Sequence, residues 1–86
     1  MPYILPEERD RIAPALKNLT AQLGTTAAPG VLNYLVTELL LSQCHASYGH
    51  MNELIGVLEC AKHEFYRRVI VPYEEQKRKQ NGDVYD

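Results

Sequence analysis

Basic and aromatic side chains are concentrated in the second half of this 86-residue chain, within a few helical turns. Arginine guanidinium groups suit phosphate oxygens, and tyrosine rings suit stacking on a nucleobase. These residue types at this spacing indicate an anionic nucleotide as the ligand of a pocket between subunits. The candidate binding residues are Lys62, Tyr66, Arg67, Arg68, Tyr73 and Lys77.

The same residues also fit an ordinary solvated helix face. Glu64 has the helical spacing to pair with Arg67 or Arg68, and such pairs contribute roughly a few tenths of a kcal/mol each. Tyrosines on helices commonly pack their rings and leave the hydroxyl in water. The pattern alone leaves both interpretations open.

Metal binding is the second chemistry to consider. Cys60 and His63 are three residues apart, and Cys44, His45 and His50 precede them. Thiolates and imidazoles are zinc ligands, but no second paired motif such as CxxC supports a site. Because cysteine is commonly a small buried hydrophobe, we expect no metal and no cofactor.

Catalysis is not expected either. A cysteine and a histidine three apart on one helix make a poor nucleophile and base pair, and no orienting third group is evident. Glu59 and Glu64 fall on different helix faces and therefore do not form an acid and base pair. We expect a protein that is not an enzyme.

Composition limits the class of protein. A chain of 86 residues buries only about 60 to 65% of its unfolded surface, so a core of its own is marginal, and two cysteines are too few for a disulfide framework. The net charge of −2 argues against general nucleic-acid binding. No signal peptide or membrane-spanning run is visible, so we expect a soluble cytoplasmic protein.

Hydrophobic periodicity predicts one all-α domain over residues 1–86. Leu54, Leu58, Ala61 and Phe65 share one face of a long third helix, Ser47 can cap that helix, and Pro72 bends or ends it. We expect a three-helix antiparallel hairpin-type subunit whose long C-terminal helix bends near Pro72. The predicted elements are an arm (1–5), helices over 6–23, 29–45 and 48–80, and a tail (81–86).

The second predicted helix is apolar on more than one side. Its seven aliphatic residues cover more than a single stripe, and a helix of this kind needs partners on two sides. One partner is plausibly a second copy of the chain, which predicts a homo-oligomer. Alternatively, the first and third helices flank it on both sides.

Several motifs together resemble a family of short proteins encoded by tailed bacteriophages and prophages, described as a domain of unknown function. The resemblance spans nearly the whole chain. Family members more often have leucine where this chain has His63, which argues further against metal. The motifs are Met1-Pro2-Tyr3-Ile4, Gly30-Val31-Leu32-Asn33-Tyr34, Asn52-Glu53, Gly56-Val57-Leu58-Glu59-Cys60-Ala61-Lys62, Glu64-Phe65-Tyr66-Arg67-Arg68, Pro72-Tyr73-Glu74 and Asn81-Gly82-Asp83-Val84-Tyr85.

The resemblance implies a small accessory protein in the cytoplasm of the infected bacterial host. Small helical phage proteins of this size include oligomeric sponges that sequester cyclic-nucleotide or ADP-ribose-type signals of host defence, and this analogy is one of size and setting. By that analogy, Asn33 or Tyr34 of a neighbouring subunit completes the pocket. The alternatives are an adaptor that binds a host protein through apolar helix faces, and a minor structural or assembly protein.

Overall fold

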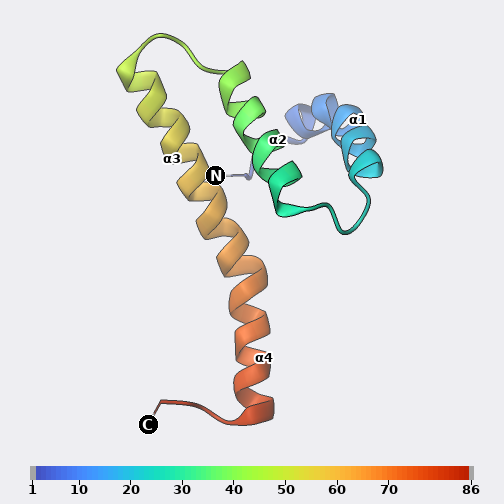
Figure 1. Ribbon diagram of the computed structural model, residues 1–86, viewed down its shortest axis with the longest axis vertical. Helices are drawn as coiled ribbons and strands as arrows, with labels where there is room; N and C mark the ends of the chain where they lie inside the picture. The colour runs from blue at the N-terminus through green and yellow to red at the C-terminus, as the bar shows by residue number, and fades with distance from the viewer. Residues whose placement is uncertain (1, 86) are drawn as a thin grey trace. The chain divides into compact units, whose positions relative to one another are not determined.

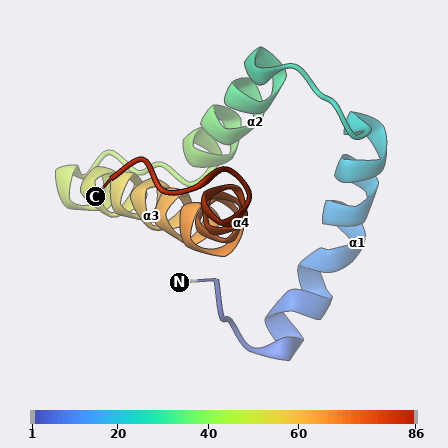
Figure 2. The same cartoon turned by 90° about the horizontal axis from the view of Figure 1, so that it is seen from below.

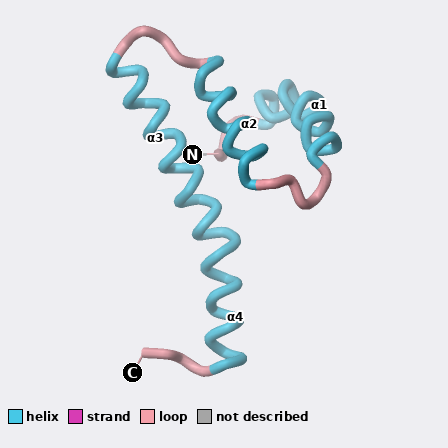
Figure 3. Tube along the Cα trace, viewed as in Figure 1, coloured by secondary structure: helices cyan, strands magenta, loops and turns pink. Residues whose placement is uncertain are grey.

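The computed structural model describes residues 2–85, and every regular element in that range is helical (Figure 1). Loops join the helices (Figure 3). The all-α prediction with a long, bent last helix is confirmed. The elements are α1 (Pro6–Leu23), α2 (Pro29–Ser42), α3 (Tyr48–Phe65), a π-helical turn η1 (Tyr66–Ile70) and α4 (Val71–Asn81).

The described chain divides into two compact units. Residues 2–51 form the N-terminal unit, and residues 52–85 form the C-terminal unit. The N-terminal unit holds α1 and α2 as separate helices joined by a connector (Figure 2). The C-terminal unit holds most of α3, with η1 and α4. Met1 of the predicted arm and Asp86 of the predicted tail lie outside the described residues.

Local signals in the sequence explain where α1 begins and ends. Pro6 occupies the first turn, where its missing N–H costs no hydrogen bond, and Glu7 and Glu8 lie at the positive end of the helix dipole. The Arg9 side chain donates to the Ile4 carbonyl at 3.1 Å, which ties the preceding arm to the helix. Gly24 ends α1 with φ 71° and ψ −158°, a conformation that is essentially restricted to glycine.

We expect Gly24→Ala to destabilise the chain, because alanine cannot adopt this conformation without strain. The cost of such strain is about 1 to 3 kcal/mol. Gly56→Ala is the matched control, since Gly56 is helical with open space around its Cα, and there alanine should stabilise by about 0.5 to 1 kcal/mol. Urea unfolding followed by circular dichroism measures both; equal effects would contradict the prediction.

The loop between α2 and α3 is held by side chains. The Ser47 hydroxyl accepts a hydrogen bond from the His50 N–H at 3.4 Å, as the sequence predicts for the cap of α3. The His50 ring lies with Nε2 2.6 Å from the Gln43 carbonyl oxygen and contacts the His45 ring at a centroid distance of 4.4 Å. α2 ends at Ser42, before the predicted end at residue 45, and these contacts join α3 to the connection that follows α2.

The long helix continues past Pro72, but it does not pass the proline as a plain α-helix. Its ring crowds the Arg68 carbonyl and supplies no N–H to it. The chain responds with the turn η1 immediately before the proline, where the Val71 N–H donates to the Tyr66 carbonyl five residues back. α4 then continues to Asn81, and Gly82 ends it at φ 84°. The sequence predicts the bend but not the π turn.

Large apolar side chains are exposed throughout the described chain. No residue of 2–85 is buried, and the exposed set includes Tyr34, Leu39 and Leu41 on α2 and Phe65, Val69 and Tyr73 of the long helix. Among the described helices, none combines the length and apolar character that crossing a bilayer requires.

Candidate functional site

The predicted binding residues of the long helix divide between its faces. Successive α-helical residues are about 100° apart, so Lys62 and Tyr66 share a face because they are four apart. Arg67 and Arg68 follow Tyr66 directly and therefore project toward other sides of the helix. The structure thus keeps Lys62 with Tyr66 and separates both arginines from that pair.

Glutamates on the same helix neutralise two of these cations. Lys62 Nζ lies 3.3 Å from Glu59 Oε1, and Arg67 Nη2 lies 2.7 Å from Glu64 Oε1. His63 Nε2 also approaches Glu59 Oε1, at 3.0 Å. The Lys62 and Glu59 side chains are both exposed, and an exposed pair contributes little to stability, about 0 to 1 kcal/mol, whereas Glu64 is partly buried. The pairing predicted for Glu64 with Arg67 is present.

The pKa of the Glu59 carboxylate is clearly perturbed. The hydrogen bond from Lys62 and the charge of Lys62 lower the pKa of Glu59 below its ordinary value of 4.5, and His63 adds smaller effects in the same direction. Glu59 is fully exposed, so solvent screens these interactions. The lowered pKa therefore indicates that Lys62 lies beside the carboxylate. It does not indicate a large contribution to stability.

We expect Lys62→Gln to raise the pKa of Glu59 toward its ordinary value, which an NMR titration of the side-chain carboxyl carbon measures. A lowered folded-state pKa means that the interaction is present above pH 4.5 and is lost as the pH falls through the lowered value. Lys79→Gln removes a lysine of another helical segment and is the control. An unchanged Glu59 titration in Lys62→Gln would contradict the pairing.

Tyr73 and Lys77 form a second aromatic and basic pair on α4. Lys77 Nζ lies 5.6 Å from the centroid of the Tyr73 ring, within the range of a cation–π contact. Asn33 and Tyr34 lie on α2 in the N-terminal unit, where the Asn33 carbonyl accepts a hydrogen bond from Thr37 Oγ1 at 2.8 Å and the Tyr34 ring is exposed. Their expected contribution from a neighbouring subunit stays a prediction.

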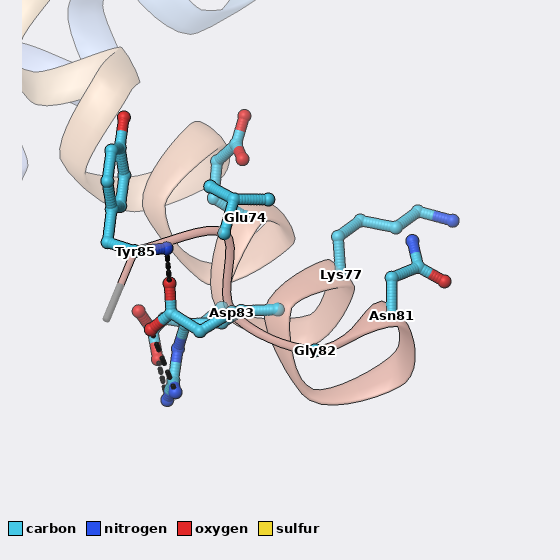
Figure 4. Close-up of a pocket in the computed structure, with 9 residues that line it drawn as sticks. Glu74, Lys77, Asn81, Gly82, Asp83 and Tyr85 are labelled. Carbon is cyan, nitrogen blue, oxygen red and sulfur yellow. Dashed lines mark hydrogen bonds and ion pairs between the residues drawn. The ribbon is translucent and has the colours of Figure 1, made fainter.

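The C-terminal unit also contains a hollow that the sequence does not predict (Figure 4). Its volume is about 420 Å³, and residues of α4 and the following tail line it. Arg78 lies 3.0 Å from Glu75 and 3.8 Å from Asp83, and Asp83 in turn accepts the Tyr85 N–H at 3.0 Å. The lining carries three carboxylates, of Glu74, Glu75 and Asp83, against two cations, Arg78 and the predicted binding residue Lys77, so the hollow does not favour an anion.

Within residues 2–85, no three histidine, cysteine or acidic side chains are grouped so that they could hold a metal ion. His45 and His50 are close, but Cys44 Sγ contacts the His45 carbonyl, at 3.6 Å, and Cys60 lies on α3 beyond them. The two histidine side chains therefore make contacts in the connection between α2 and α3.

Comparison with known proteins identifies a family but no characterised relative. A family profile described as a domain of unknown function, DUF6899, matches residues 1–84. No curated protein matches the chain, and no solved structure does. The match covers every motif on which the sequence resemblance rests, with the exception of the last residue of the terminal one, Tyr85.

Proposed function

The chain belongs to the DUF6899 family, a domain of unknown function, and from this premise we propose that it is a non-enzymatic homo-oligomer that binds and sequesters a small nucleotide-derived anion. The observation that carries the proposal is the Lys62 and Tyr66 pair beside an exposed apolar helix face. A phosphate takes the place of Glu59 on the lysine, and a base stacks on the tyrosine.

Three features support this assignment. The cation of the pair is solvent-accessible and held only by an exposed ion pair, so a ligand can reach it. Tyr66 lies where the helix widens into η1, with its ring exposed. Tyr73 and Lys77 repeat the same combination of ring and cation further along. Arg67 and Arg68 project from other sides of the helix and are not part of the surface that Lys62 and Tyr66 share.

The proposed setting is the cytoplasm of a bacterium infected by a phage, as the sequence resemblance implies. A protein that binds a cyclic oligonucleotide or an ADP-ribose-type signal there would remove an alarm signal of host defence. This setting explains why binding alone suffices and no catalytic group is needed. Asn33 and Tyr34 of another subunit are proposed to line the same pocket.

Native mass spectrometry of the protein isolated from infected cells tests the proposal, together with calorimetric titration of cyclic di-AMP, cyclic di-GMP and ADP-ribose. We expect an oligomer that carries extra mass in the nucleotide range and an affinity tighter than about 1 μM, which corresponds to about −8 kcal/mol. Absence of added mass and of micromolar binding to all three probes would refute the sponge.

A second candidate function is an adaptor that binds a host protein. The observation in its favour is α2, which carries Glu38 as its single charged residue and exposes Tyr34, Leu39 and Leu41. An amphipathic groove on a host protein could accept such a helix. A pull-down from host lysate that recovers a stoichiometric partner, lost in Leu39→Lys, would favour this function over the sponge.

A further inference from the structure

An apolar seam runs along the long helix of the C-terminal unit without a covering partner inside that unit. We define the apolar seam as Leu54, Leu58, Ala61, Phe65, Val69 and Tyr73. Its members are separated by steps of four, three, four, four and four residues. Phe65 and Tyr73 are 60% and 57% exposed, and Leu58 is 42% exposed.

The π turn keeps this seam on one side of the helix. In a plain α-helix each four-residue step advances about 40° beyond a full turn, so the three steps from Ala61 to Tyr73 would drift by roughly 120°. In the π turn, the Val71 N–H donates a hydrogen bond to the carbonyl of Tyr66, five residues back. Such a turn accommodates one extra residue and so cancels roughly 100° of this drift. The seam is therefore continuous from Leu54 to Tyr73.

The two halves of the helix carry opposite charge. Tyr48–Phe65 contains three glutamates and one lysine, a net −2, whereas Tyr66–Asn81 contains five lysines and arginines and two glutamates, a net +3. The sign changes between Phe65 and Tyr66, close to the middle of the seam. Two such helices side by side attract when antiparallel and repel when parallel.

From these observations we propose that the seam binds the same seam of a second copy in an antiparallel pair, with the twofold axis beside Phe65 and Tyr66. Opposite charges overlap fully when the two sign changes coincide, which sets this register. Leu58 then lies level with Tyr73 of the other copy, and Ala61 with Val69. The inference deepens the proposed function and rests on its self-association, not on its ligand.

The pairing also brings two copies of the Lys62 and Tyr66 pair together. Lys62 and Tyr66 lie together on one flank of the seam, and in an antiparallel pair each flank faces its own copy across the twofold axis. Two lysines and two tyrosines thereby converge, while Arg67 stays on the far side of each helix. The site then has twofold symmetry and suits an anion with two phosphates and two bases, bound as one ligand per two chains.

Disulfide trapping tests the pairing in the full chain, with Cys44→Ser and Cys60→Ser as background. We expect Leu58→Cys and Tyr73→Cys proteins to cross-link when mixed and oxidised, and each alone to cross-link at least tenfold less. Efficient cross-linking of Leu58→Cys to itself would indicate parallel helices and overturn the proposal. So would an absence of cross-links in every combination, or a monomeric native mass.

The result separates this inference from the proposed ligand. Cross-linking in the mixture without binding of cyclic di-AMP, cyclic di-GMP or ADP-ribose would keep the pair and refute the sponge. Binding with only parallel cross-links would keep the sponge and refute the antiparallel seam. An Ile55→Cys variant, on the flank of the seam, is the matched control for nonspecific oxidation.

Discussion

Replacing Leu58 with lysine should raise the dissociation constant of the dimer about a thousandfold. Each dimer loses two apolar side chains from the seam, each contributing about 2 kcal/mol, and tenfold in affinity corresponds to about 1.4 kcal/mol. The two ammonium groups add a desolvation cost in the same direction. Sedimentation velocity over a concentration series measures the change, and circular dichroism should show a parallel loss of helix at low concentration.

Gly56→Lys is the matched control, because it introduces the same side chain into the same helix on the face away from the seam. Gly56 has open space around its Cα, and Glu53 and Glu59 are three residues away on either side. We therefore expect unchanged or slightly stronger helicity and an unchanged oligomer mass. Equal dissociation of both variants would contradict a seam confined to one face.

Replacing Tyr66 with alanine should weaken binding of the nucleotide probe by about 5- to 150-fold for each stacked base, because a base stacked on an aromatic ring contributes about 1 to 3 kcal/mol. Tyr66 lies on the flank of the seam and not in it, so the oligomer mass should stay the same. Calorimetry with cyclic di-AMP, cyclic di-GMP or ADP-ribose, using whichever binds the unmodified protein, measures both affinity and stoichiometry.

Tyr48→Ala is the control for Tyr66→Ala, since Tyr48 is an exposed tyrosine of α3 remote in sequence from the candidate pair. It should leave affinity unchanged. A loss of affinity that accompanies a loss of assembly would mean that Tyr66 packs between subunits. Unchanged affinity in Tyr66→Ala would exclude the proposed stacking.

Much of the fold follows from short signals in the sequence. Pro6, Pro29 and Ser47 mark helix starts because each suits a position where backbone N–H groups lack partners, and Gly24 and Gly82 mark ends because they tolerate positive φ. These signals do not predict the π turn, because a proline indicates that the helix is distorted but not which hydrogen bonds replace the lost one. Nor do these signals predict the end of α2 at Ser42 or the contact of His50 with Gln43, residues on opposite sides of a loop.

The candidate site was predictable in composition but not in arrangement. Adjacency in sequence suggested that Tyr66, Arg67 and Arg68 act together, whereas a helix sends adjacent residues to different sides. Helical periodicity alone could have found the Lys62 and Tyr66 pair. Pairing of Lys62 with Glu59 follows from the i,i+3 spacing in the same way. The sequence does not predict that so many of the large apolar side chains among the described residues are exposed.

The extra residue held in η1 has a consequence for chain length. Deleting one residue within Tyr66–Ile70 converts the wide turn into an ordinary one, and every residue beyond it keeps its side of the helix. Deleting one residue within Leu54–Ala61 instead turns the remainder of the helix by roughly a quarter of a circle. Length variation among members of this family should therefore be tolerated just ahead of the proline and rare in the two turns after Leu54.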